Sequence, residues 1–250
     1  MNNKKKIVLF LSLGITILSL ITAVSSVIRY RGGELFIPAP YATKELKGIV
    51  NFSFKDASEL QEWKDRIFNG KVKYSIKSDS EGNFLSAESK NSASGLIYWI
   101  KLDLKKKPMI SWKWKVTKFP KQKEDTCEKT GWIEEDDYAA RFYVIFPRFP
   151  FYRMECLEYV WDENTPKDKV LTNPNFNNLK VIIAESGKQN MNKWVYIERN
   201  VYQDFKKAFG KEPTRVGAIA IMTDSDNTKS AAEAQYKDIE VGYENQQKKN

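Results

Sequence analysis

The segment MISWKWKVTK, residues 109–118, decides the fold class of this chain. Its apolar and polar side chains alternate strictly, with Ile110, Trp112, Trp114 and Val116 on one face and Ser111, Lys113 and Lys115 on the other. Alternation with a period of two is typical of a β-strand that has one buried and one wet face. The segment therefore predicts a strand whose two tryptophans lie in a hydrophobic core.

Similar short alternating runs, separated by turn-forming residues, extend along the rest of the chain. The predicted strands cover residues 49–54, 71–77, 84–90, 96–102, 109–118, 138–146, 155–161, 179–186, 194–199, 216–223 and 236–243. Two short helices are predicted, one over 56–68 after Asp56 or Ser58 as cap, and one from the Asn200 cap to Gly210. This pattern predicts a mainly β protein, an antiparallel β-sandwich of the jelly-roll type, with its first and last strands paired.

The N-terminus carries a nearly uninterrupted apolar run from Ile7 to Ile28, preceded by three lysines. At about 1.5 Å per residue a helix of this length spans roughly 33 Å, enough to cross a bilayer. The lysines keep the N-terminus cytoplasmic and send the rest of the chain across the membrane. We therefore expect a membrane anchor or signal peptide over 1–30, a linker over 31–47, the sandwich over 48–244 and a polar tail over 245–250.

The composition excludes several classes of function. The formal charge is +9, but five positive charges belong to the first 31 residues, and no concentrated basic face for nucleic acid remains. The chain has no histidine, which excludes Ser-His-Asp catalysis, Cys-His catalysis and His-ligated zinc. The only cysteines, Cys127 and Cys156, fit either a disulfide in an oxidising compartment or two free thiols.

Six segments carry a resemblance to a bacterial family: 136–141 (DDYAAR), 158–161 (EYVW), 185–187 (ESG), 199–201 (RNV), 209–210 (FG) and 223–228 (TDSDNT). With these segments in this order, the chain resembles the domain of unknown function 3047 family. The resemblance extends from about residue 52 to residue 243. The resemblance implies a fold similar to the galactose-binding-like jelly rolls, a class rich in carbohydrate-binding modules. It implies no catalytic residue and no cofactor.

Candidate site residues gather where polar groups end apolar strands. Asp136, Asp137 and Arg141 precede or open one predicted strand, and Asp224, Asp226 and Asn227 follow another. We expect these two groups to form a ligand-binding edge, with Trp132 as an exposed platform for a sugar ring. Carboxylates there could also hold Ca²⁺, although a solvated loop or an Asx-turn explains the same residues.

Glu185 is the remaining candidate, because it ends a buried strand. With Asp137 or Asp224 it could supply the two carboxylates of a glycosidase. Tyr138 or Tyr159 with Arg141 could instead serve a lyase, while strand-end carboxylates commonly just pair with Arg141 or Arg199. Among the other tryptophans, Trp99, Trp161 and Trp194 are further candidates for sugar stacking.

The function predicted is non-catalytic binding of a carbohydrate or another cell-envelope ligand on the outer side of the cytoplasmic membrane. Two alternatives stay open at this point. One is a glycan-cleaving enzyme, either a polysaccharide lyase or a glycoside hydrolase. The other is a structural or assembly factor that binds a second envelope protein. No cofactor is expected beyond the calcium considered above.

Overall fold

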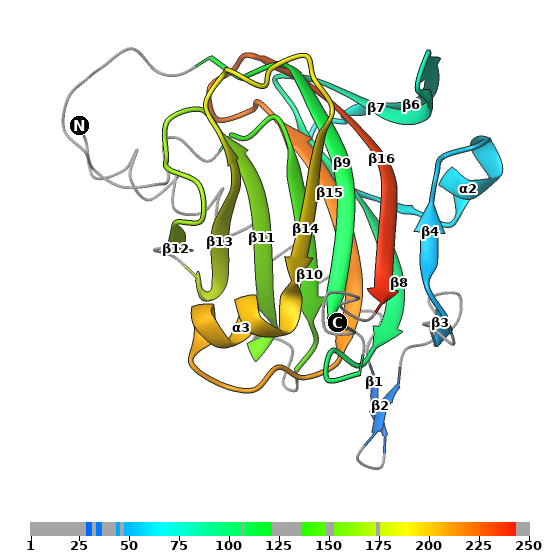
Figure 1. The fold of residues 1–250 in the computed structure, drawn as a ribbon, viewed down its shortest axis with the longest axis vertical. Helices are drawn as coiled ribbons and strands as arrows, with labels where there is room; N and C mark the ends of the chain where they lie inside the picture. Colours follow the sequence, from blue (N-terminus) through cyan, green and yellow to red (C-terminus); the bar gives the residue numbers. More distant parts are fainter. Residues whose placement is uncertain are drawn as a thin grey trace, which may run out of the picture.

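Two β-sheets pack against each other in the computed structural model of this chain (Figure 1). The structure describes residues 29–31, 34–36, 44–45, 48–106, 108–121, 137–148, 153–173 and 176–243. Within these ranges strands dominate and two short helices lie at the periphery of the sheets, which confirms the predicted β-sandwich.

The larger sheet has eight strands. Seven run in the order β12 (Val170–Asn173), β13 (Phe176–Ser186), β11 (Glu155–Asp162), β10 (Arg141–Phe146), β15 (Val216–Asp224), β8 (Ala93–Leu102) and β3 (Lys44–Glu45), and β5 (Lys64–Asn69) also pairs with β8. The pairs β11–β13 and β3–β8 are parallel. The other strand pairs are antiparallel, as the predicted sandwich requires, and the short strand β12 was not predicted.

The smaller sheet has six strands. Five run in the order β14 (Val195–Asn200), β9 (Met109–Lys118), β16 (Ala231–Tyr243), β7 (Gly82–Lys90) and β6 (Lys73–Asp79), and β4 (Val50–Phe52) also pairs with β16. The pairing of β4 with β16 confirms the expected contact between the first and last strands of the domain. A separate two-stranded pair, β1 (Arg29–Arg31) and β2 (Glu34–Phe36), precedes the domain.

The core between the sheets is rich in aromatic side chains. Trp112 and Trp114 are fully buried there, as the alternation of residues 109–118 predicts. The Trp112 indole stacks on Phe142 of the facing sheet, with ring centroids 4.4 Å apart and planes 8° from parallel. Stacked rings of this kind join the two sheets through a large apolar contact. The other face of β9 is left for contacts outside the core.

The second helix agrees with its prediction, and the first does not. Helix α3 (Val201–Phe209) begins at Asn200, whose side chain accepts a hydrogen bond from the Gln203 N–H, and it ends at Gly210 in the left-handed conformation. Helix α2 (Ala57–Gln61) is capped by Asp56 as expected, but it covers only the start of the predicted range. The chain then enters β5, because pairing with β8 supplies its backbone hydrogen bonds.

Several predicted features fall outside the described residues. They include the apolar segment 7–28, the polar tail, Cys127, Trp132 and Asp136. Among the described residues no helix has the length and apolarity needed to cross a membrane. Cys156 is a free, buried thiol, and burial raises its pKa well above the usual value.

Candidate functional site

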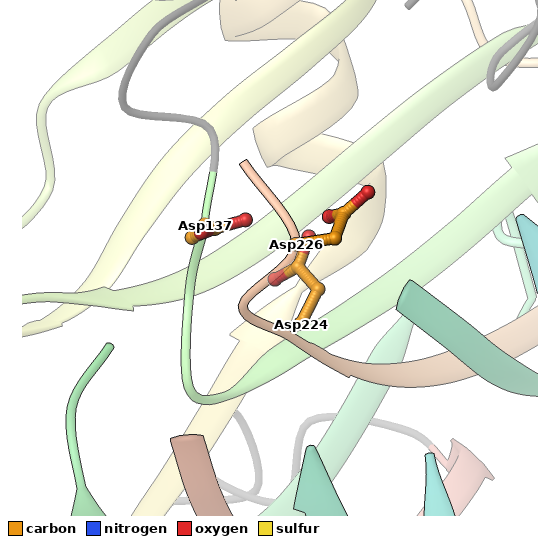
Figure 2. A group of neighbouring side chains, drawn as sticks. All are labelled: Asp137, Asp224 and Asp226. Carbon is orange, nitrogen blue, oxygen red and sulfur yellow. The ribbon is translucent and has the colours of Figure 1, made fainter. Parts of the chain in front are cut away.

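Five of the predicted site residues come together at one end of the sandwich, although they lie far apart in the sequence. Asp137 is on the loop that leads into β10, and Asp224 and Asp226 are at and beyond the end of β15 (Figure 2). Carboxylate oxygens of these three aspartates lie within 4.8 Å of one another. We call the group Asp137, Arg141, Asp224, Asp226 and Asn227 the aspartate cluster.

Asp137 fixes the turn that follows β15. Its Oδ1 accepts a hydrogen bond from the Asn227 N–H at 3.2 Å. Its Oδ2 accepts from the Thr228 N–H at 2.7 Å and from the Thr228 hydroxyl at 2.6 Å. A nearly buried carboxylate with this many donors stabilises a loop, because each orphan N–H would otherwise lose its solvation without a partner.

Arg141 forms a buried ionic network with two carboxylates. Its Nε and Nη2 donate to the two oxygens of Asp224 at 3.0 and 2.6 Å, and its Nη1 donates to Glu158 Oε1 at 2.9 Å. The Tyr143 hydroxyl also donates to Glu158 Oε1, at 2.9 Å. The guanidinium further lies over the Tyr138 ring, 4.8 Å from its centroid. The alternative reading, in which strand-end carboxylates pair with Arg141, is therefore correct for Asp224.

The sequence did not single out Glu158 or Tyr143 as partners of Arg141. Both lie on the same sheet face as Arg141, because Tyr143 is two residues further along β10 and Glu158 is its register partner on β11. The spacing of Arg141 and Tyr143 was visible in the sequence. The pairing of β10 with β11 in this register was not.

Glu185 does not join the aspartate cluster. It lies on β13, which is separated from β10 by β11, and its carboxylate accepts hydrogen bonds from Lys167 at 3.2 Å and from Asn190 at 3.0 Å. Tyr159, the other candidate base, is fully buried and donates to Asp204. Burial, together with the charge of Asp204, raises the pKa of Tyr159 well above its usual value. That tyrosine is thus poorly suited to accept a proton.

The aspartate cluster has the ligand chemistry of a hard cation, since Ca²⁺ is held by carboxylate oxygens. Most of those oxygens already accept protein hydrogen bonds, however: both of Asp137, both of Asp224 and one of Asp226. The neighbouring guanidinium of Arg141 also supplies positive charge at the place where a cation would bind. Protein hydrogen bonds and the charge of Arg141 thus satisfy most of the cluster's carboxylate oxygens.

A second group of chemically active side chains lies on the outer face of the six-stranded sheet. Register partners share a face, and a row of them crosses the sheet: Ser75 on β6 faces Ser86 on β7, Ser86 faces Gln235 on β16, and Gln235 faces Lys115 on β9. Beside this row lie Phe84, Trp194, Tyr196 and Lys237, and we call these eight residues the Trp194 face.

Trp194 is the centre of this face. Two ammonium groups lie against its indole ring, that of Lys115 at 4.4 Å from the centroid and that of Lys237 at 4.3 Å. Phe84 meets the indole edge-on, with centroids 5.6 Å apart. Contacts of this kind hold an aromatic ring in a fixed orientation. Tyr196, two residues after Trp194 in the sequence, is 55% exposed.

The tip of the β6–β7 hairpin helps to hold these side chains. Asp79 accepts hydrogen bonds from the Trp194 indole N–H and from the Lys115 ammonium, both at 3.3 Å. Burial acts to raise the pKa of Asp79, but hydrogen bonds from the Glu81 N–H, Trp194 and Lys115 outweigh it, and the pKa lies below its usual value. Glu81 binds the ammonium of Lys237, whose side chain is only 2% exposed.

Two polar atoms of the Trp194 face have no hydrogen-bond partner although they are buried. They are Gln235 Oε1 and Ser75 Oγ. Buried polar groups in folded proteins are nearly always satisfied, since leaving one unpaired costs about 1–3 kcal/mol. Gln235 Oε1 and Ser75 Oγ are two of nine such atoms in the part of the chain that the structure describes. The face thus combines fixed aromatic rings with hydrogen-bonding capacity that the protein itself does not use.

The tryptophans that were candidates for sugar stacking divide between core and surface. Trp161 is fully buried between the sheets, which excludes it as a platform. Trp99 is partly buried on the outer face of the larger sheet, and Trp194 is partly exposed on the smaller one. Of the two lysines beside Trp194, Lys115 was visible on the wet side of residues 109–118. The contribution of β16 and β6 required the tertiary structure.

Comparison with known proteins identifies one matching family and several solved structures of low sequence identity. The family model described as "Protein of unknown function (DUF3047)" matches residues 61–240. None of the curated proteins matches the chain.

Three of the solved structures are similar to this chain at low sequence identity. They are the glycoside hydrolase domain of Endo-D from Streptococcus pneumoniae R6 (12% identity, TM-score 0.37), a family 30 carbohydrate-binding module of a Clostridium thermocellum cellulase (9%, 0.41) and a variant of the Cel12A cellulase of Rhodothermus marinus (10%, 0.41). The matches cover 74%, 74% and 77% of this chain, and 22%, 92% and 98% of the respective structures. The chain thus spans about a fifth of the Endo-D structure. At this distance function must be inferred from the side chains of the chain itself.

Proposed function

This chain belongs to the DUF3047 family of proteins of unknown function, and we propose that its β-sandwich binds a carbohydrate of the cell envelope without cleaving it. The proposed binding surface is the Trp194 face. The hydrophobic segment 7–28 supports a location on the outer side of the cytoplasmic membrane, where the domain is anchored or released.

The observation that carries this proposal is the arrangement of aromatic and polar groups on the Trp194 face. A sugar ring has an apolar face that packs on an aromatic side chain and hydroxyl groups that need hydrogen-bond partners. Trp194 and Tyr196 supply the rings. Gln235 and Ser75 supply polar atoms that have no partner within the protein. A carbohydrate satisfies both kinds of group at once.

Binding without cleavage is favoured because the candidate carboxylates Asp137, Asp224 and Glu185 are engaged by protein donors. Hydrolysis of a glycosidic bond needs two carboxylates that face the substrate. Asp224 and Glu158 are nearly fully buried and bound to Arg141, and Glu185 lies apart from them. A lyase or hydrolase would release new sugar ends from a polysaccharide, and we expect none.

We predict that Trp194→Ala and Tyr196→Ala each weaken binding at least about tenfold, a loss of roughly 1.4 kcal/mol in binding free energy. The protein is tested by affinity electrophoresis against a panel of neutral and acidic polysaccharides, and each hit is then titrated by calorimetry. Tyr202→Ala on α3 serves as the matched control, because it removes a partly exposed aromatic ring away from the Trp194 face. If no polysaccharide retards the protein, or if all variants are retarded equally, the proposal is contradicted.

The aspartate cluster is a second candidate position for the ligand. It is supported by Asp226, whose Oδ2 accepts a hydrogen bond from the exposed Asn69 side chain at 3.0 Å. Asp226→Ala and Asn227→Ala leave the buried Arg141 network intact, so lost binding at unchanged stability would place the ligand there. In the same samples we expect added Ca²⁺ to leave the unfolding temperature unchanged, because most cluster oxygens already have partners.

The remaining alternative is an assembly factor that binds a second envelope protein. It predicts stable copurification with a protein partner that free sugars do not displace. The polysaccharide titration distinguishes the two, since a carbohydrate receptor binds its ligand in the absence of any other protein.

A further inference from the structure

The polar row of the Trp194 face is long in the direction across the strands. It runs from Ser75 through Ser86 and Gln235 to Lys115 and so crosses β6, β7, β16 and β9. Neighbouring strands lie about 4.8 Å apart, so the row spans roughly 14 Å. That length exceeds a single sugar ring. A monosaccharide therefore cannot contact Ser75 and Lys115 at once.

The polar atoms without partners lie within this row, with Gln235 opposite Lys115 and Ser75 at the β6 end. Gln235 Oε1 is a pure acceptor, and Ser75 Oγ both donates and accepts. Ser75 is flanked on β6 by Lys73 and Lys77, whose side chains are 70% and 47% exposed. Long, exposed lysines move at little cost, so a ligand that displaces them reaches the polar atoms beneath.

Each of five lysines on this face is paired with a carboxylate, and Lys73 and Lys77 share Glu88. The ion pairs are Lys73–Glu88, Lys77–Glu88, Lys113–Asp238, Lys115–Asp79 and Lys237–Glu81, with N–O distances from 2.6 to 3.8 Å. The hydrogen bond from Lys77 lowers the pKa of Glu88, which keeps that carboxylate charged. An acidic chain would compete with these carboxylates for their lysines, whereas an uncharged chain does not compete for the lysine charges. The pairing therefore disfavours an acidic ligand.

We infer that the ligand of the Trp194 face is an uncharged linear glycan several sugar rings long, which lies across the strands from Trp194 toward Ser75. This inference rests on the proposed function and specifies its ligand class. The sugar at one end stacks on the aromatic pair Trp194 and Tyr196. The following sugars donate hydroxyl groups to Gln235 Oε1 and exchange hydrogen bonds with Ser75.

The test uses oligosaccharides of glucose, mannose, xylose and N-acetylglucosamine, each from one ring to six rings, titrated into the full chain by calorimetry. Alginate oligomers of the same lengths are the charged comparison. We expect affinity to rise at least tenfold between one and four rings and to change little between 50 and 300 mM salt. An affinity that is complete with one ring, or tighter and salt-dependent binding of alginate, would overturn the inference while leaving glycan binding itself in place. If no oligomer binds, the proposed function fails too.

Gln235→Met gives a sharper test because it removes an acceptor that the folded protein does not use. We expect this variant to be as stable as the parent protein, or more stable, since an unsatisfied buried group is lost. Its affinity for the four-ring chain should fall at least fivefold, and by a larger factor than its affinity for a single ring. If the longer chain binds equally well to the parent and the variant, the row does not contact the ligand and the inference is wrong.

Discussion

At the scale of single residues, Arg141 shows how much a buried charge depends on its partners. The guanidinium is 4% exposed and neutralised by Asp224 and Glu158, which are equally inaccessible. Buried ion pairs of this kind contribute little net stability against apolar replacements, but removing one member leaves the others uncompensated. This asymmetry makes the Arg141 network a sensitive probe of the aspartate cluster.

We predict that Arg141→Met lowers the free energy of unfolding by about 3–5 kcal/mol, because Glu158 and Asp224 stay buried without their arginine. Urea unfolding followed by tryptophan fluorescence measures the change. Arg148→Met is the control, since its partner Glu155 keeps a second cation, Lys211, and the loss should be smaller. Equal losses in the two variants would show that Arg141 has no special role in the network.

At the scale of secondary-structure elements, hydrogen bonding between strands decided the conformation of the chain after Gln61. The apolar spacing there was that of a helix. Leu60, Trp63 and Ile67 have the spacing of a helix, yet the chain leaves the helical conformation after Gln61. Trp63 packs on Phe52, and Ile67 is 49% exposed on the strand that follows. The strand forms because β8 offers it a paired edge, and a partner of that kind is invisible in a local window.

Helix α3 is the opposite case, since its start and end are encoded locally. We predict that Asn200→Ala costs about 0.5–2 kcal/mol of stability, because the Gln203 N–H loses its side-chain acceptor. Asn200→Asp retains an acceptor oxygen and should cost much less. Thermal unfolding of both variants by circular dichroism tests this prediction, and an alanine variant as stable as the parent would contradict it.

At the scale of the whole molecule, the proposed function requires that the sandwich lie outside the cytoplasm. The charge before the apolar segment 7–28 makes that orientation the expected one. The resemblance to the DUF3047 family, given from six short segments, is confirmed over residues 61–240. Family membership does not by itself place the domain on either side of a membrane.

We predict that a reporter enzyme active only outside the cytoplasm is active when fused after Asn250 and inactive when residues 1–30 are deleted from the same fusion. The reason is that this segment is the only long apolar run in the sequence that could direct export. Extraction with alkaline carbonate then distinguishes an anchored protein, which stays with the membrane, from a cleaved and released one. A fusion that is active in the cytoplasm alone would refute the proposed location.

The amino-acid sequence by itself determined the class of the fold, because strand alternation, helix caps and turn residues act over a few neighbouring positions. Residues 109–118 specify a strand with a buried tryptophan face, and Asn200 and Gly210 delimit α3. The absence of histidine likewise needed no structure. Strand alternation and helix caps of this kind depend only on residues that are close together in the sequence.

Only the tertiary structure decided which side chains meet. It paired Arg141 with Glu158, left Glu185 apart, and brought Trp194 together with Lys237 and Phe84. These encounters depend on strand order and register, which are set by the packing of the whole core and not by any single segment. A shift of one residue in one strand would turn that strand's share of the Trp194 face into the core. No local pattern in the sequence fixes that choice alone.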